Sequence, residues 1–136
     1  ERDLLESYII KNNATNVTLM GYKNKEEIFK FYRSSDVFIF PSNEDIYGHV
    51  INESLSQGLP VISTINVNSA KKLIKNDYNG FLTNDLSTDN LKKLIDATIS
   101  KDRFNACVDT AKENTIEKTV ENHIQNFERL MKWLTF

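Results

Sequence analysis

Two carboxylates and a glycine near the start of a predicted helix are the residues most suited to chemistry. Seven residues separate Asp45 from Glu53, and Gly48 directly precedes a helix predicted over residues 49–57. Free backbone N–H groups at a helix start bind anions such as phosphate, and a glycine lets a ligand approach closely. Glu53 follows His49 by four residues, so both lie on one helix face, and a carboxylate accepts hydrogen bonds from sugar hydroxyls. The pattern indicates a site for a nucleoside diphosphate that carries a sugar.

The elements around this group alternate between short apolar runs and helical patterns. Strands are predicted at residues 17–20, 37–40, 61–64 and 81–83, and helices at 1–11, 25–34, 49–57, 69–75, 88–100, 103–112 and 115–134. A uniformly apolar run such as 37–40 is typical of a strand buried on both faces of a parallel sheet. The predicted fold is therefore α/β, a Rossmann-like parallel sheet flanked by helices, with ligands at the carboxyl ends of the strands.

Composition narrows the function further. The chain has 136 residues, 40% of them hydrophobic, which predicts one globular domain. Seventeen basic and nineteen acidic residues leave a net charge of −2, so nothing favours binding to nucleic acid. No apolar run reaches the length of about 18 residues that a membrane helix needs, and a signal peptide is not predicted. The single Cys107 is expected to be a small core residue, and the chain is expected to be cytoplasmic.

Residues 41–64 resemble the signature of the GT-B retaining glycosyltransferases of the GT4 type, the glycosyl transferases of group 1. That signature holds two acidic residues with seven residues between them, an aromatic residue and a glycine before a helix, and Gly-x-Pro after it. Tyr47, Gly48, Gly58 and Pro60 occupy these places here. Residues 17–21, 34–42 and 76–82 resemble further motifs of the family, so the similarity covers about residues 1–100 in order.

The resemblance implies a role for each residue of the group. Asp45 is expected to be the catalytic residue that contacts the donor-sugar hydroxyls, and Glu53 to bind the nucleotide ribose. The implied donor-binding residues are Glu53, Gly48, His49, Val50 and Tyr22. The backbone amides of His49 and Val50 are expected to hold the distal phosphate. Tyr22 is expected to mark the region that meets the base. No metal and no cofactor is expected, because the nucleotide-sugar is itself the donor substrate.

The sequence also departs from the family pattern at several points. Asp45 stands where the first acidic residue is usually Glu, which shortens its reach by one methylene, and Ile46 replaces a glycine. The loop after Thr64 lacks the usual Gly-Gly or Pro-Glu pair. These differences concern how the phosphates and the sugar are held, rather than the fold.

The resemblance implies an incomplete domain. Residues 1–136 are expected to form part of a nucleotide-sugar-binding domain, the C-terminal half of a GT-B fold without its first two strands, and alone they should not catalyse. The helix within 115–136 is expected to pack toward an acceptor domain and to leave part of its apolar stripe, near Trp133 and Phe136, exposed or covered by another chain. Direct parallel pairing of strand 17–20 with strand 37–40 is predicted, and self-association is the alternative.

The predicted function is donor binding in a retaining enzyme that transfers a sugar from a nucleotide-sugar to a glycan or a lipid-linked acceptor. Bacterial surface-polysaccharide assembly is the expected setting, with the whole enzyme peripheral at the inner membrane face if its acceptor is lipid-linked. Two alternatives stay open at this point. One is a sugar-nucleotide epimerase of GT-B architecture, and the other is a non-catalytic α/β nucleotide-binding module.

Overall fold

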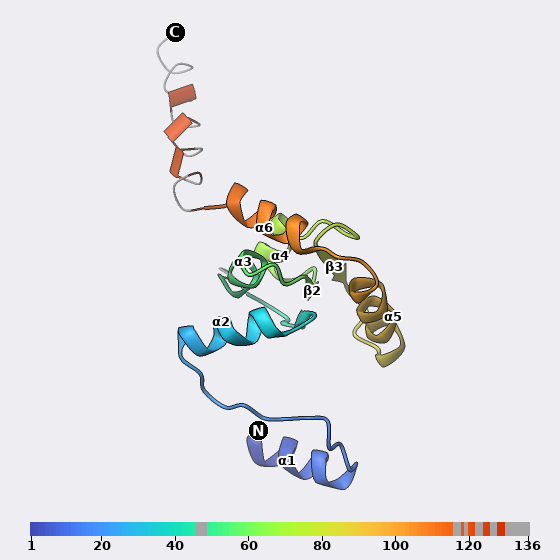
Figure 1. The fold of residues 1–136 in the computed structure, drawn as a ribbon. Coiled ribbons are helices and arrows are strands. Elements are labelled where there is room, and N and C mark those ends of the chain that lie inside the picture. Colours follow the sequence, from blue (N-terminus) through green and yellow to red (C-terminus); the bar gives the residue numbers. More distant parts are fainter. Residues whose placement is uncertain (46–48, 116–117, 119, 122–123, 126–127, 130–136) are drawn as a thin grey trace.

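The computed structural model describes residues 1–45, 49–115, 118, 120–121, 124–125 and 128–129 (Figure 1). The named elements are α1 (Arg2–Lys11), α2 (Lys25–Ser34), β1 (Phe38–Phe40), α3 (His49–Ser56), β2 (Val61–Thr64), α4 (Asn68–Leu73), β3 (Gly80–Thr83), α5 (Thr88–Ile99) and α6 (Phe104–Glu113). Strands and helices alternate from α2 to α5, so the predicted α/β class is confirmed.

The sheet contains three parallel strands in the order β1-β2-β3. Phe38 pairs with Val61, and Val61 in turn pairs with Gly80, so β2 is the central strand. All four residues of β2 are buried, because this strand has a neighbour on each side. The prediction that the run 37–40 is buried on both faces is wrong: the three residues of β1 are only half-buried, since β1 lies at the edge of the described sheet. Helix α3 packs against α4, α6 and α2, and α5 packs against β3 (Figure 1). The carboxyl ends of all three strands therefore meet at one edge of the sheet.

The core lies between β2 and the helices α3, α4 and α6. Its buried members are Ile51, Leu55, Val61, Val67, Ala70, Leu73, Ile74, Cys107 and Ala111. The prediction that Cys107 is a small core residue is confirmed, because its side chain is fully buried in this cluster. Burial of these side chains is the dominant stabilising contribution to such a domain.

Two local signals in the sequence produce the predicted backbone. The Asn24 side chain accepts a hydrogen bond from the Glu27 N–H, and the Glu27 carboxylate accepts one from the Asn24 N–H, a complete capping box at the start of α2. Gly58 follows α3 with φ +80°, the left-handed conformation that a helix-ending glycine adopts. Both ends are set by residues within a few positions along the chain.

The predicted strand at residues 17–20 is wrong. These residues belong to no β-ladder in the described structure, and the direct pairing with β1 is therefore also wrong. Residues 12–24 instead lead away from the sheet to α1, which lies apart from the other helices (Figure 1) and has no buried residue. A strand gains its hydrogen bonds only from a neighbour, so an apolar run that reaches no strand edge stays irregular.

The C-terminal segment is described only in part. Residues 118, 120–121, 124–125 and 128–129 are helical, in line with the helix predicted over 115–134. The prediction about Trp133 and Phe136 falls outside the described residues. In the part of the chain that the structure describes, no helix combines the length and the apolar character needed to cross a membrane.

Candidate functional site at the carboxyl edge of the sheet

The loop after β1 is attached to the loop after β2. Asp45 forms an isolated parallel bridge with Val67, and the Asn68 N–H donates to the Asp45 carbonyl oxygen at 3.3 Å. Nearer the strands, the Thr64 hydroxyl donates to the Ser42 carbonyl. These bonds hold the backbone of Asp45 at the carboxyl edge of the sheet, where ligands of parallel α/β proteins bind.

Helix α3 begins at His49, as predicted, and leads away from this edge. The His49 side chain is exposed and Val50 is half-buried, while Ile51 is fully buried in the core. Gly48 lies outside the described residues. The buried Ile51 fixes the first turn of α3 against the core, so the N–H groups of that turn have a defined direction.

Glu53 lies one turn into α3 and faces α2. Its Oε1 is 3.5 Å from the Lys25 ammonium nitrogen, and its side chain is 30% exposed. The Tyr32 side chain is buried on α2, and its pKa is raised by burial and by the nearby charge of Glu53. Glu53 is therefore a half-buried carboxylate at the boundary between α3 and the aromatic face of α2.

Lys25 is not among the site residues predicted from sequence. It is the first residue of α2, and its ammonium lies 5.5 Å from the centroid of the Phe29 ring. A helix dipole disfavours a cation in the first turn, so a lysine there requires compensation from other groups. The contact of Lys25 with Glu53 depends on the packing of α2 on α3, so the sequence alone does not point to Lys25.

Tyr22 lies in the irregular segment that leads into α2. Its side chain is 94% exposed, and it precedes the capping residue Asn24 by two positions. The structure thus connects Tyr22 through a short segment to Lys25, the residue that contacts Glu53. Its expected position beside a nucleotide base stays a prediction.

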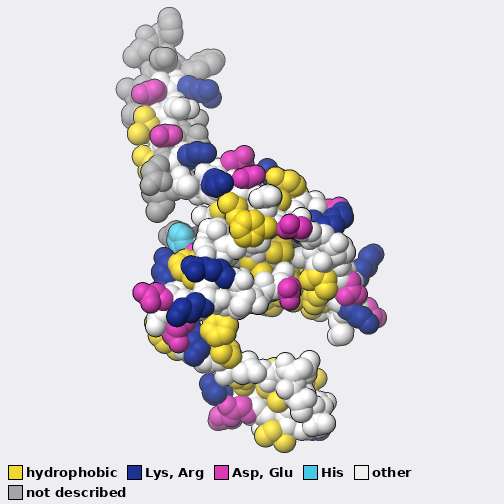
Figure 2. Space-filling view, in the orientation of Figure 1, with side chains coloured by type: hydrophobic (Ala, Val, Ile, Leu, Met, Phe, Trp, Pro, Cys, Tyr) yellow, Lys and Arg dark blue, Asp and Glu magenta, His cyan; other side chains and the backbone are white. Residues whose placement is uncertain are grey.

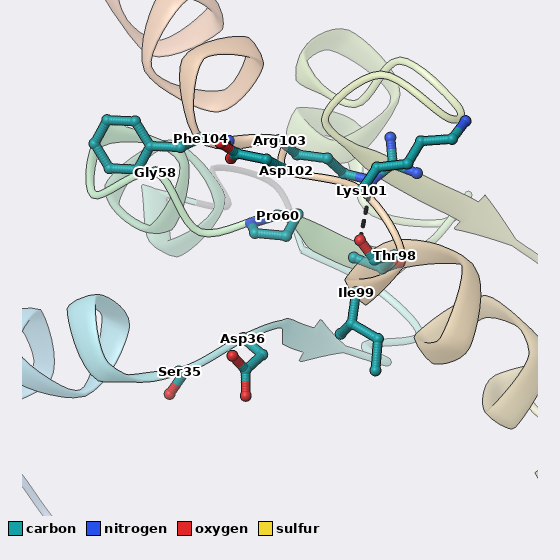
Figure 3. Close-up of a pocket in the computed structure, with 10 residues that line it drawn as sticks. All are labelled: Ser35, Asp36, Gly58, Pro60, Thr98, Ile99, Lys101, Asp102, Arg103 and Phe104. Atoms are coloured by element: carbon teal, nitrogen blue, oxygen red, sulfur yellow. Dashed lines mark hydrogen bonds between the residues drawn. The ribbon is translucent and has the colours of Figure 1, made fainter.

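A cavity of about 220 Å³ lies away from these residues, at the amino edge of the sheet (Figure 3). It is lined by Ser35, Asp36, Gly58, Pro60, Thr98, Ile99, Lys101, Asp102, Arg103 and Phe104. Ser35 and Asp36 precede β1 and Pro60 precedes β2, which places the cavity at the end of the strands opposite Asp45. None of the predicted site residues lines it, so it is separate from the candidate site.

Charges of both signs are mixed on the face of the molecule that Figure 2 shows. In the view of Figure 2, Lys and Arg side chains are interspersed with Asp and Glu, as the net charge of −2 predicts. Among the described residues, no group of three or more His, Cys, Asp and Glu side chains is placed to hold a metal ion. The candidate site thus consists of a helix start, two carboxylates and one lysine.

Comparison with known proteins places this arrangement in a family. The family model described as glycosyl transferases group 1 matches residues 1–130. An uncharacterized glycosyltransferase of Methanocaldococcus jannaschii is 25% identical over 129 residues, which are 95% of this chain and 33% of that protein. The GtfA subunit of a UDP-N-acetylglucosamine–peptide N-acetylglucosaminyltransferase of Streptococcus agalactiae is 32% identical over 95 residues, covering 69% of this chain and 18% of the subunit.

Two further similarities extend the comparison. A UDP-Gal:alpha-D-GlcNAc-diphosphoundecaprenol alpha-1,3-galactosyltransferase of Escherichia coli is 29% identical over 121 residues, or 89% of this chain and 28% of that enzyme. Sucrose-phosphate synthase of Thermosynechococcus elongatus matches in structure with a TM-score of 0.75 at 18% identity, over 98% of this chain and 35% of that chain. This structural match confirms the Rossmann-like sheet of a GT-B protein.

The extent of these matches defines what they establish. The chain spans about a third or less of the length of each of these relatives. The family match, by contrast, covers nearly the whole chain and includes the loop and helix that carry Asp45 and Glu53. The chain therefore belongs to the glycosyl transferases group 1 family.

Proposed function

We propose that this chain binds the nucleotide-sugar donor of a glycosyltransferase. The observation that carries the proposal is the placement of α3, which starts beside the loop that fixes Asp45 to Val67 and has Glu53 one turn further on. A helix start attracts the diphosphate, while carboxylates suit hydroxyl groups. The proposed site therefore combines both kinds of group that a nucleotide-sugar requires.

The proposed roles follow from the chemistry of each group. The amides of His49 and Val50 bind the distal phosphate, which stabilises charge on the departing nucleoside diphosphate, and Gly48 lets the donor approach closely. Glu53 accepts hydrogen bonds from the ribose hydroxyls. Asp45 accepts hydrogen bonds from the donor sugar and orients it for transfer, and Tyr22 marks the segment that meets the base.

We extend the proposal to the reaction of the complete protein. Transfer proceeds with retention of configuration and without a bound metal, as the resemblance of residues 41–64 to retaining enzymes implies. The names of the streptococcal and Escherichia coli relatives both contain a UDP-sugar donor, so uridine diphosphate sugars are the first donors to test. By their names, the streptococcal relative acts on a peptide, and the Escherichia coli relative acts on a diphosphoundecaprenol-linked sugar.

The acceptor we propose is a glycan or a lipid-linked glycan of a bacterial surface polysaccharide. The name of the Escherichia coli relative, with its diphosphoundecaprenol-linked sugar, supports the lipid-linked form. Such an acceptor would bring a cytoplasmic enzyme to the inner membrane face as a peripheral protein.

The test uses the complete protein and a panel of UDP-, GDP-, ADP- and CDP-sugars, with lipid-linked and soluble glycan acceptors. Mass spectrometry follows transfer to the acceptor, and nuclear magnetic resonance follows both the anomeric configuration of the product and any change in the donor sugar. Transfer with retention supports the proposal. Epimerised nucleotide-sugar without transfer would indicate an epimerase, and nucleotide binding without any conversion would indicate a binding module.

A further inference from the structure

The pair formed by Lys25 and Glu53 joins two helices at the proposed ribose position. Lys25 is the first residue of α2, Glu53 lies in the second turn of α3, and 3.5 Å separates their charged atoms. The Lys25 side chain is 72% exposed and that of Glu53 is 30% exposed. A ligand that enters from solvent can therefore reach the carboxylate while the ammonium remains beside it.

The position of Lys25 is itself determined by its neighbours. The capping box of Asn24 and Glu27 fixes the backbone on both sides of Lys25. The ammonium then lies near the face of the Phe29 ring, which attracts a cation. The helix dipole repels the ammonium, so the ring and the Glu53 carboxylate are the groups that stabilise it there.

A flexible glutamate loses rotamer freedom when it binds a ligand, and a partner that orders it beforehand lowers that cost. A carboxylate has about four acceptor positions on its two oxygens. Lys25 contacts Oε1, which leaves acceptor positions for a pair of neighbouring hydroxyls. The ion pair thus orders the carboxylate without occupying it fully.

We propose that Lys25 is a positioning residue that holds the Glu53 carboxylate ready for the ribose hydroxyls of the nucleotide. This inference rests on the proposed donor-binding role of Glu53. Under this proposal, Lys25 increases the affinity that the ribose hydroxyls add to nucleotide binding. It does not change the binding of the phosphates or the stability of α2.

The experiment measures that contribution directly in the complete protein. ADP, GDP, UDP and CDP are first compared by isothermal titration calorimetry, and the tightest binder is then compared with its 2′,3′-dideoxy counterpart. The ratio of the two dissociation constants is the ribose ratio, expected to be about tenfold or more when a carboxylate binds the hydroxyls. Lys25→Met should lower this ratio about threefold and leave the dideoxy affinity unchanged.

Matched variants identify the cause. Lys25→Arg should retain the ratio, because it keeps a cation at the same place. Lys30→Met, at an exposed lysine of the same helix, should leave it unchanged. In a Glu53→Gln background, Lys25→Met should have no further effect on the ratio, because the group that it positions is no longer a carboxylate.

Three results would overturn the inference, and they differ in what else they affect. If Glu53→Gln abolishes the ribose ratio but Lys25→Met leaves it intact, the positioning role of Lys25 is wrong and the proposed donor-binding function stands. Equal loss of ribonucleotide and dideoxynucleotide affinity in Lys25→Met would show a structural effect on α2. A wild-type ratio near one would overturn both this inference and the ribose role of Glu53.

Discussion

The Asn79 side chain donates a hydrogen bond of 3.0 Å to the Thr110 hydroxyl and so joins the turn before β3 to α6. Its Nδ2 also donates to the Leu73 carbonyl at 2.9 Å, and its Oδ1 accepts from the Lys75 N–H at 2.8 Å. Asn79 is fully buried, so these bonds form in an environment of low polarity. The Asn79 side chain thereby links the end of α4, the turn before β3 and helix α6.

Asn79→Ala is expected to lower the free energy of unfolding by about 2–4 kcal/mol, because it removes the bonds of Asn79 to the buried Leu73 carbonyl and to the partly buried Lys75 N–H. Urea denaturation of the complete protein measures the change. Thr110→Val is the matched control, since it removes one acceptor of the Asn79 amide together with the bond from the Thr110 hydroxyl to the Ala106 carbonyl within α6, and its effect should be about 1 kcal/mol. Equal effects of the two changes would show that Asn79 has no such central role.

Gly58→Ala is expected to destabilise the protein by about 2–4 kcal/mol through backbone strain and a steric clash. The residue has φ +80°, and an added Cβ would lie 2.0 Å from Cδ2 of the Phe104 ring. Thermal and urea denaturation should show part of this loss relieved in a Phe104→Ala background, where only the strain of the positive φ remains. A loss of the same size in both backgrounds would exclude the clash with Phe104.

Arg103→Met is expected to lower the free energy of unfolding by about 3 kcal/mol. Arg103 is buried, and its guanidinium donates to the carbonyls of Ala97 and Thr98 at the end of α5 and to the Asp77 carboxylate. Arg103→Lys keeps the charge but not the planar set of donors, so it should recover less than half of the loss. Urea titration of both variants measures this, and full recovery by lysine would contradict the argument.

Cys107 is expected to resist thiol reagents in the folded protein. Burial raises the pKa of its thiol to about 12, from an ordinary value of 9.0. At pH 8, alkylation of the Cys107 peptide, followed by mass spectrometry, should be slow without denaturant and rapid in urea. Since the folded pKa is the higher one, the stabilising effect of the neutral buried thiol is complete below pH 9 and decreases as the pH rises from 9 toward 12. Equal alkylation rates in both conditions would contradict burial.

Glu53→Ala and Asp45→Ala are expected to affect different steps of the reaction in the complete protein. Loss of the ribose contact proposed for Glu53 should weaken donor affinity about tenfold, measured by calorimetry with the nucleoside diphosphate. Loss of Asp45 should reduce kcat by about a hundredfold and change nucleotide affinity little, because the contact proposed for Asp45 is with the sugar alone. Asp96→Ala, at an exposed acid on α5, serves as the control and should change neither value. If Glu53→Ala and Asp45→Ala both change donor affinity and kcat only slightly and equally, the two carboxylates have no role in donor binding or transfer.

The elements that depend on neighbouring residues were predictable from the sequence alone. The capping box at Asn24 and Glu27, the glycine after α3 and the short apolar runs that begin β1 and β2 each act over a few residues of chain, so their patterns carry enough information. For the same reason the sequence placed Asp45 after a strand and Glu53 on a helix. It therefore determined the α/β class and the order of the candidate site along the chain.

Contacts between distant residues were decided only by the tertiary structure. Residues 17–20 have the apolar pattern of a strand, but β1 pairs with β2 and these residues reach no strand in the described structure. Asn79 and Gly80 indicate a turn, yet the burial of Asn79 against α6 follows from the packing of residues that lie 31 positions apart. The ion pair of Lys25 and Glu53 likewise exists because α2 packs on α3. Pairing and burial depend on which partner the folded chain brings near, and local patterns do not contain that information.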